Sequence, residues 1–464
     1  MKAINPATEL VTGDYPQHDP AAVERALATA SAAFAPWRGR SVAQRAALMK
    51  SVAAVLRRQI NDLARLITTE MGKPITAAAA EVEKCAVACD YYAEQAGRFL
   101  SPRTVPSDAT ISYVRYDPLG CVLAIMPWNF PFWQVFRFAA PALTAGNVAI
   151  LKHASNVPGC ALAIEKVFAD AGLPPGVFTS LLIDGAQAQA LIGHRHIAAV
   201  TLTGSESAGM AVAAAAGKAL KKSVLELGGS DPFMVLADVD VDSVAKAAAA
   251  ARCINSGQSC IAAKRFVVDY RIVEHFTQAL AEQMRHLKVG DPLDRTTYIG
   301  PLARQDLLSD LHQQVQRSCA AGARLICGGQ RLQRPGYYYA PTVLGDVRPG
   351  MAAFDEETFG PVAAVISAGD LPEMIALANA SGFGLGASIW SRDIDRAQRM
   401  AEQLECGCVF INGGVKSDPR LPFGGVKRSG YGRELSDVGM HEFVNIKTVW
   451  VKDLQQPPSP NRSE

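Results

Sequence analysis

The chain has 464 residues, of which 49% are hydrophobic, so it is long enough to bury more than one core and too large for a small binding module. Its 46 Lys and Arg residues against 44 Asp and Glu residues leave a formal charge of +2, which lacks the basic excess of nucleic-acid-binding proteins. Length and charge therefore argue against a nucleic-acid partner and favour one large α/β enzyme or roughly two to four domains.

The first residues, MKAINPATELVTGDYPQ, interrupt every apolar run with polar residues or proline and carry no readable signal or transit peptide. No apolar stretch reaches the ~18 residues that a membrane span needs. We therefore expect a soluble, cytoplasmic protein without a membrane partner. Its ten cysteines are more typical of small core side chains than of a disulfide framework. No C-x-x-C pair faces a matching Cys or His pair, so no metal site is predicted.

Helices are predicted to dominate the first hundred residues. Residues 41–72 carry apolar side chains at three-to-four spacing, a possible capping box of Ser41 with Gln44, and Gly72 as a stop signal. A second helix is predicted from about residue 75 to residue 100.

Five short apolar runs alternate with helical segments in the next part of the chain. They span residues 120–128, 147–153, 177–183, 197–204 and 223–229. Their continuous rather than alternating apolarity is typical of strands buried on both faces, and the spacing between them fits βαβ crossovers. This pattern predicts a doubly wound parallel sheet, which is the usual nucleotide platform.

A second α/β pattern begins beyond Gly229 and ends near FGGVKRSG (423–430). Its predicted strands are KRFVVDY (264–270), AAVISA (363–368), GASIWS (386–391) and GCVFING (407–413). Helices are predicted at about 272–287 and 371–380. We therefore expect a second domain laid against the first, followed by a loose hydrophilic tail at residues 455–464.

Three stretches contain residues that can carry chemistry. INSGQSC (254–260) places Cys260 after a small, flexible turn that would leave its backbone N–H free to face an oxyanion, although a lone Cys of this kind more often packs in a core. LELGGSDP (225–232) places Glu226 in an apolar strand, where burial would raise its pKa toward that of a general base; a Glu turned to solvent is equally consistent. MPWNFP (126–131) holds Asn129 between two prolines, either as a rigid oxyanion donor or in a loop whose aromatics only pack.

The dinucleotide fingerprint G-x-G-x-x-G does not follow the first predicted strand. TGSESAG (203–209) instead places Gly204 and Ser205 at a strand-to-helix junction, where backbone N–H groups and the helix dipole favour phosphate. This signal is common, so the residues alone leave the cofactor open.

Five motifs taken together resemble the aldehyde dehydrogenase superfamily. They are MPWNFP (126–131), LELGG (225–229), NSGQSC (255–260), EETFGPV (356–362) and PFGGVKRSGYGRE (422–434). With LKHASN (151–156) and the short N-terminus, the chain looks most like the short bacterial succinate-semialdehyde dehydrogenases. The resemblance implies that Cys260 is the nucleophile, that Asn129 is the oxyanion donor and that Glu226 activates the water that hydrolyses a thioester.

The resemblance also implies an architecture of two doubly wound α/β domains, one Rossmann-like and one catalytic, with a β oligomerisation arm. The NAD(P)-binding domain would comprise residues 1–108 and 120–228, and the catalytic domain residues 229–428. Residues 429–441 would return to the cofactor domain, and residues 109–119 and 442–464 would form the arm and tail. Family members pair such an arm between subunits, which implies a homodimer or homotetramer.

Either NAD or NADP is implied as the cofactor. The family pattern assigns it Pro127, Trp128, Lys152, Ser155, Gly204, Ser205, Leu227, Glu357 and Phe359. Relatives restricted to NAD commonly have Glu at the position of Ser155, because a carboxylate repels a 2′-phosphate. Lys152 and Ser155 therefore leave NAD and NADP both open.

The implied reaction is oxidation of succinate semialdehyde to succinate through a cysteine thiohemiacetal and a thioester. Arg137 matches an arginine that grips the far carboxylate in semialdehyde-specific relatives, and Arg420 and Ser417 would complete the grip. A structural role is the alternative for Arg137, and Ile254 stands where some of these relatives have another Arg. Glutarate semialdehyde or an uncharged short aldehyde are alternative substrates. A cofactor-free thiol esterase and a non-catalytic structural protein are the alternative functions.

Overall fold

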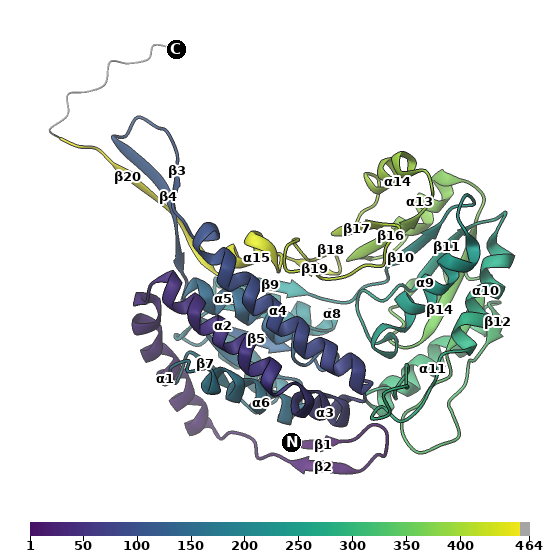
Figure 1. Cartoon of the computed structure of the whole chain (residues 1–464), viewed down its shortest axis with the longest axis horizontal. Helices are drawn as coiled ribbons and strands as arrows, with labels where there is room; N and C mark the ends of the chain where they lie inside the picture. The colour runs from purple at the N-terminus through teal and green to yellow at the C-terminus, as the bar shows by residue number, and fades with distance from the viewer. Residues whose placement is uncertain (455–464) are drawn as a thin grey trace.

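The computed structural model describes residues 1–454, which form two α/β lobes and a projecting β arm (Figure 1). The predicted loose tail at residues 455–464 lies outside the described residues. None of the helices within the described part of the chain is long and apolar enough to cross a membrane.

The first lobe is built on a six-stranded sheet in the order β19-β9-β8-β5-β6-β7. Its parallel strands are β5 (Cys121–Met126), β6 (Val148–His153), β7 (Phe178–Ser180), β8 (Ile197–Thr203) and β9 (Lys222–Glu226). These strands coincide with the five predicted apolar runs and confirm the parallel sheet. The edge strand β19 (Gly430–Tyr431) returns from late in the chain and pairs antiparallel with β9.

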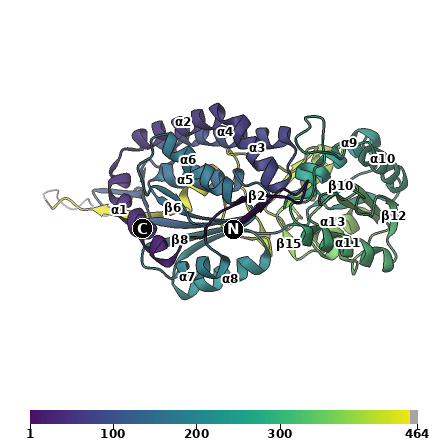
Figure 2. The same ribbon diagram turned by 90° about the horizontal axis from the view of Figure 1, so that it is seen from below.

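Helices cover both faces of this sheet. Figure 2 shows α2 to α6 on one side and α7 and α8 on the other. The helices of this lobe are α1 (Pro20–Gly39), α2 (Val42–Arg58), α3 (Ile60–Met71), α4 (Ile75–Phe99), α5 (Trp133–Ala145), α6 (Pro158–Asp170), α7 (Gly185–Ile192) and α8 (Glu206–Lys218). A short hairpin of β1 (Lys2–Ile4) and β2 (Val11–Asp14) precedes them. The lobe is therefore doubly wound, as the sequence predicts.

The helical pattern at residues 41–72 forms two helices rather than one. The predicted capping box is present, because the Ser41 side chain accepts from the Gln44 backbone and the Gln44 side chain accepts from the Ser41 backbone. Gln59 interrupts the pattern with φ −100° and ψ 10°, and α3 then ends at Gly72 in a left-handed conformation. Both helices pack against α4, so the break bends the apolar stripe around α4 without exposing it.

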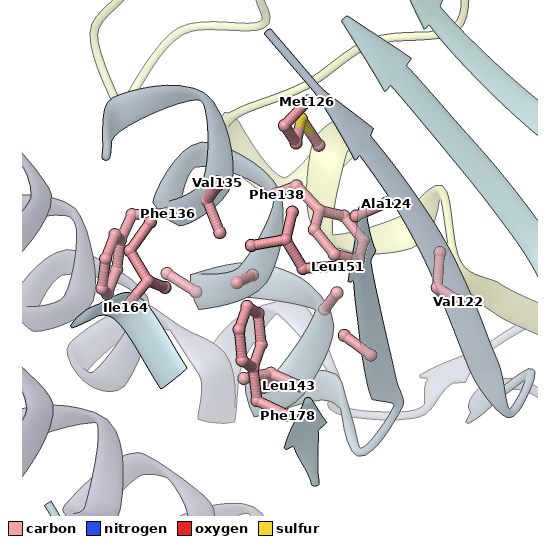
Figure 3. Packing of buried hydrophobic residues seen from close by; sticks show 14 of the residues in the cluster. Val122, Ala124, Met126, Val135, Phe136, Phe138, Leu143, Leu151, Ile164 and Phe178 are labelled. Carbon is pink, nitrogen blue, oxygen red and sulfur yellow. The ribbon is translucent and has the colours of Figure 1, made fainter. Parts of the chain in front are cut away.

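Helix α5 is the best-buried helix of the first lobe and follows directly on the loop that contains Asn129. All its residues are buried. In Figure 3, Phe138 lies near Ala124 of β5 and Leu151 of β6, Phe136 lies beside Ile164 of α6, and Leu143 lies beside Phe178 of β7. Fully burying each such side chain contributes about 1.5–3 kcal/mol. This packing fixes where the helix begins and therefore where the Asn129 loop ends.

The second lobe contains a seven-stranded sheet in the order β12-β13-β14-β11-β10-β16-β17. Its strands are β10 (Pro232–Val235), β11 (Arg265–Asp269), β12 (Arg324–Cys327), β13 (Thr342–Gly345), β14 (Val362–Ala368), β16 (Gly386–Trp390) and β17 (Cys408–Ile411), of which only β12 runs antiparallel to its neighbour. The four predicted strands correspond to β11, β14, β16 and β17. Strands β10, β12 and β13 were not predicted.

Six helices and several shorter elements complete the second lobe and its junction with the first. They are α9 (Val241–Cys253), the 3₁₀ turn η1 (Ile254–Gly257), α10 (Val273–Arg285), α11 (Gln305–Ala320), α12 (Ala352–Asp355), α13 (Leu371–Asn379), α14 (Ile394–Ala401) and a small pair of β15 (Phe383–Gly384) with β18 (Val426–Lys427). Helices α10 and α13 match the two predicted helices to within about two residues at each end. The boundary difference is of the size by which helix ends commonly fray.

The arm is a three-stranded antiparallel sheet in the order β20-β4-β3. Strand β4 (Ile111–Pro118) pairs along its whole length with β20 (Val444–Val451), and β3 (Arg103–Thr104) pairs on the other side of β4. Helix α15 (Ser436–His441) precedes β20. The arm extends away from the two lobes (Figure 1), and β20 is the longer of its two edge strands and is called the outer strand here.

The turn before Cys260 provides a test of the packing between segments of the second lobe. Gly257 has φ 79°, and a Cβ there would lie 2.3 Å from the backbone C and O of Gly360. We expect Gly257→Ala to lower the melting temperature by about 2–5 °C, because both the backbone conformation and the contact disfavour a side chain. Gly217→Ala is the matched control, because a Cβ at Gly217 in α8 would meet nothing within 4 Å. This substitution also replaces a helical glycine by alanine, which favours the helix.

The measurement is differential scanning fluorimetry of the two variants beside the wild type. Gly217→Ala should melt at or slightly above the wild-type temperature. An unchanged melting temperature for Gly257→Ala would contradict the tight packing described here.

Candidate active site

Cys260 follows three consecutive residues in the left-handed region of backbone space. Asn255, Ser256 and Gly257 have φ values of 52°, 57° and 79°, respectively. Only glycine adopts this region without strain, so the first two positions cost of order 1–3 kcal/mol each unless surrounding contacts enforce them. The predicted flexible turn is therefore a constrained turn.

Side-chain hydrogen bonds hold this turn from several directions. Asn255 Nδ2 donates to the backbone oxygens of Asn129 at 2.7 Å and Gln258 at 3.0 Å. The Gln258 side-chain oxygen accepts from the backbone N–H of Ala303 at 2.9 Å. The turn is thus joined to the Asn129 loop and to the segment that leads into α11.

Two buried cations bind the carbonyl oxygens around Cys260. Arg252 Nη2 donates to the Gly257 oxygen at 2.7 Å. Lys264 Nζ donates to the oxygens of Ser259 at 3.1 Å and Cys260 at 2.9 Å. These contacts fix the orientation of the peptides on either side of Cys260, including the peptide that carries the Cys260 N–H.

The Cys260 thiol is half-buried and protonated at neutral pH. Burial raises its pKa to about 12, while Arg137 and Lys264 act in the opposite direction. Among residues 1–454, no acceptor takes the Cys260 backbone N–H, which is therefore free to face a ligand. A thiolate must be generated at this position by loss of a proton.

Asn129 is buried beside the Cys260 turn. Its Nδ2 donates to the Gln258 carbonyl oxygen at 3.2 Å, and its Oδ1 has no partner among the described residues. The following residues are anchored by Glu81 of α4, which accepts from the backbone N–H groups of Phe132 at 2.9 Å and Trp133 at 3.0 Å. Buried Lys73 pairs with the same Glu81. The second amide hydrogen of Asn129 Nδ2 is left available to a ligand.

Glu226 ends β9 and is fully enclosed by protein. Neither of its carboxylate oxygens has a hydrogen-bond partner among the described residues. Burial raises its pKa well above the ordinary value, with Arg137 acting in the opposite direction and Glu434 reinforcing the shift. A Cβ at Gly424 would lie 2.7 Å from Glu226 Oε1 and 2.9 Å from the Gly432 backbone oxygen, so a side chain at this position would crowd the carboxyl group. Glu226 is turned inward, which resolves the two alternatives that the sequence leaves open.

The carboxyl ends of β6 and β8 carry the residues predicted to contact adenosine and pyrophosphate. Lys152 is half-buried at the end of β6, and burial lowers its pKa. Ser155 is exposed two residues beyond that strand. After β8, Ser205 caps α8 by accepting from the Ala208 N–H at 3.3 Å, and the Gly204 N–H donates to Glu226 O at 3.0 Å. The Gly204 amide is therefore committed to the sheet.

The residues predicted to lie on the nicotinamide side come from three segments of the chain. Trp128, next to Pro127, makes an edge-on contact with Phe359 at 5.7 Å between ring centroids. Glu357 Oε1 accepts from the Gly229 N–H at 3.0 Å, and burial raises the Glu357 pKa. Buried Leu227 lies against the first turns of α8, where a Cβ at Gly209 would meet it at 2.6 Å.

The three predicted substrate residues differ in what they contact. Arg137 is buried, pairs with Glu434, and donates to Thr203 Oγ1 at 3.3 Å. The Arg420 side chain is 72% exposed and pairs with Asp418 at 2.6 Å. Both guanidinium groups are thus already neutralised by carboxylates of the chain, which argues against their gripping a substrate and favours the structural alternative for Arg137.

Ser417 is the predicted substrate residue that the fold does bring to the Asn129 segment. Its Oγ accepts from Lys84 Nζ at 2.7 Å and from Trp133 Nε1 at 3.0 Å.

Sequence reasoning missed Lys84, Lys264 and Glu434 as residues of the site. Glu434 ends one of the recognised motifs, but Lys84 lies in an ordinary helical pattern and Lys264 at the start of a strand, where nothing local marks them.

The arrangement joins a thiol, an amide donor and a carboxyl group of raised pKa at the junction of the two lobes. A thiol that adds to a carbonyl, a donor for the resulting oxyanion and a base for water are the components of acyl chemistry through a thioester. No cluster of side chains suited to holding a metal ion occurs among residues 1–454.

Comparisons with known proteins agree with this chemistry. The model of the aldehyde dehydrogenase family matches residues 1–449. A probable succinate-semialdehyde dehydrogenase (NADP+) of Synechocystis sp. is 52% identical over 451 residues, covering 97% of this chain and 99% of that protein. A succinate semialdehyde dehydrogenase (NAD(P)+) of Escherichia coli K12 is 50% identical over 448 residues, covering 97% of each chain.

Solved structures show the same fold. The crystal structure of succinic semialdehyde dehydrogenase from Streptococcus pyogenes in complex with NADP+ superposes with a TM-score of 0.95 at 36% sequence identity. The match covers 97% of this chain and 100% of that chain. The observed pair of α/β domains is therefore the fold that the resemblance implies.

The raised pKa of Cys260 predicts the pH dependence of its alkylation. In the protein alone, the rate of reaction with iodoacetamide should rise about tenfold per pH unit from pH 7 to pH 10 without a plateau, because the thiolate fraction keeps increasing below a pKa of about 12. The modification is followed by mass spectrometry of the Cys260 peptide. A small free thiol, with a pKa of about 8.5, is the control that should plateau. A plateau below pH 9 for Cys260 would contradict the burial argument.

Proposed function

The chain belongs to the aldehyde dehydrogenase family, and we propose that it oxidises succinate semialdehyde to succinate with NADP or NAD. The observation that carries the proposal is the convergence of Cys260, Asn129 and Glu226 from three distant segments on one site. Relatives at about half identity over nearly the whole chain carry the name of this reaction, which supports the substrate assignment.

Cys260 acts as the nucleophile in the proposed reaction. Its sulfur, once deprotonated, bonds to the aldehyde carbon, and the carbonyl oxygen becomes an oxyanion. The free N–H of Cys260 and the second amide hydrogen of Asn129 donate to that oxygen. A nicotinamide held beside Trp128, Glu357 and Phe359 would supply the acceptor for the hydride, and loss of that hydride from the carbon would leave Cys260 carrying a thioester.

Glu226 acts as the base in the second half of the reaction. It accepts a proton from a water molecule whose oxygen bonds to the thioester carbon, and the carbon–sulfur bond breaks to release the acid. The Cys260 sulfur departs as a thiolate and regains a proton. The enclosed position of Glu226 suits this role, because a carboxylate of raised pKa takes up the water proton more readily than an exposed one.

The nucleotide fits the carboxyl edge of the first sheet. Lys152 and exposed Ser155 would contact the adenosine ribose, where no acidic residue stands in residues 151–156 to repel a 2′-phosphate. Ser205 and the start of α8 would face the pyrophosphate. Pro127, Trp128, Leu227, Glu357 and Phe359 would lie on the nicotinamide side.

The domain assignment follows from this placement. We assign residues 1–108 and 120–228 to the cofactor-binding domain and residues 229–428 to the catalytic domain, which carries the Cys260 thiol.

We also propose a cytoplasmic homo-oligomer, dimer or tetramer, that associates through the arm. Outer strand β20 exposes Ile446 (61%) and Trp450 (48%), and an apolar edge strand of this kind favours pairing with another chain.

Steady-state kinetics test the proposed reaction. Succinate semialdehyde should give the highest kcat/KM when compared with glutarate semialdehyde and with butanal, and reduction of the nicotinamide is followed by absorbance. Cys260→Ala should lower the rate by more than about 1000-fold, since no other nucleophile occupies its position. Butanal as the best substrate would contradict the carboxylate assignment, and hydrolysis of an ester without any nicotinamide reduction would instead support a thiol esterase.

The choice between NADP and NAD is tested at Ser155. Ser155→Glu should lower kcat/KM for NADP by about tenfold or more and leave that for NAD within about threefold, because the new carboxylate repels only the 2′-phosphate. Ser155→Ala is the control and should retain use of both cofactors. An equal loss for both cofactors in Ser155→Glu would place this residue away from the ribose.

A further inference from the structure

Lys84 is a half-buried cation that none of the assigned roles uses. It lies on α4, and its Nζ donates to Ser417 Oγ at 2.7 Å while lying 4.1 Å from the centroid of the Trp133 ring. The Trp133 indole N–H donates to the same oxygen at 3.0 Å. Trp133 and Arg137 are one helical turn apart on α5, so Lys84 faces the same side of α5 as Arg137.

The charge of Lys84 is not balanced by a carboxylate. Lys84 forms no ion pair within residues 1–454. The nearby acids are committed elsewhere, because Glu81 pairs with Lys73 and Asp418 pairs with Arg420. Arg137 also lies nearby, but its charge is paired with Glu434. An unpaired cation in such surroundings is stabilised by an anionic ligand.

The titration of Lys84 is consistent with this imbalance. Burial and then Arg137 lower its pKa to about 8, while Cys85 and Glu81 on the same helix and Asp418 act in the opposite direction. An anion bound beside Lys84 would favour its charged form.

Ser417 supplies the second half of an anion site. A serine hydroxyl has two acceptor positions and one donor hydrogen. Lys84 and Trp133 occupy both acceptor positions, and the Ser417 O–H has no acceptor among the described residues. The hydroxyl is therefore set as a donor toward a ligand that also meets the Lys84 ammonium.

We propose that the Lys84 ammonium and the Ser417 hydroxyl bind the far carboxylate of the ω-carboxylated aldehyde substrate. This inference rests on the proposed function and names the residue that makes the enzyme specific for an aldehyde with a far carboxylate. It differs from the assignment made from the sequence, in which Arg137 and Arg420 perform this task. Arg137 instead remains paired with Glu434 and contributes through its field.

Lys84→Met tests the proposal, because it keeps an apolar stem of similar length and removes the charge. KM for succinate semialdehyde should rise about 10- to 100-fold, which corresponds to the loss of a hydrogen bond to a charged group. The kcat for succinate semialdehyde and kcat/KM for butanal, which has a methyl group in place of the carboxylate, should stay within about twofold. Activity on butanal also shows that the variant is folded.

Two further variants serve as controls. Lys84→Gln removes the charge with a polar side chain and should give the same rise in KM. Arg420→Met removes an exposed, already paired cation and should leave the preference for succinate semialdehyde within about twofold of the wild type.

The pH profile distinguishes carboxylate binding from a structural role. The quantity to follow is the ratio of kcat/KM for succinate semialdehyde to kcat/KM for butanal. In the wild type this ratio should fall as the pH rises through about 8, because Lys84 loses its proton. Ionisation of Cys260 affects both substrates equally and cancels in the ratio. The ratio should be flat in Lys84→Met. A flat wild-type ratio, or a Lys84→Met variant that keeps its preference, would overturn the inference and leave the proposed function intact. A wild type that prefers butanal would overturn both.

Discussion

The constraint on which the site depends is the left-handed turn from Asn255 to Gly257. Three successive residues with positive φ do not persist on local preference, because only the last is glycine. The turn is maintained by hydrogen bonds from outside it, including those to Asn129 and from Ala303. The same contacts that enforce the turn therefore bring the Asn129 loop of the first lobe and the Cys260 segment of the second lobe together.

Buried cations hold the backbone around the thiol. Arg252 donates to the Gly257 oxygen, and Lys264 donates to the oxygens of Ser259 and Cys260. Lys264 also pairs with the Glu357 carboxylate at 3.8 Å, so a negative charge shares this part of the site. Lys264 lowers the Cys260 pKa and Glu357 raises it, while burial remains the largest effect.

Much of the fold could be predicted from the sequence, because buried strands and amphipathic helices leave periodic patterns. The five strands of the first sheet and the Ser41 capping box are local features, and the structure contains them. Strands β10 and β13 were missed, although predicted β17 is no longer than they are, so strand length alone does not decide which strands the sequence reveals. The break at Gln59 was missed because the apolar stripe continues across it.

The site was less predictable, because pairing between distant residues decides what each side chain can do. Cys260, Asn129 and Glu226 lie in recognisable motifs. Arg137 and Arg420 look alike in the sequence as free cations, yet Glu434 and Asp418 neutralise them. Arg137 and Glu434 lie far apart in sequence, so no local pattern records their pairing, whereas Asp418 stands only two residues before Arg420.

Arg137 acquires a different importance once its pairing is known. Burial favours the protonated forms of both Cys260 and Glu226, although the reaction needs each of them ionised at one stage. Arg137 is the first opposing charge for both groups, so its field favours the thiolate and the carboxylate alike. Arg137 stays paired with Glu434, which offsets part of this field and itself raises the Glu226 pKa. Recognition of the substrate anion is therefore left to another cation.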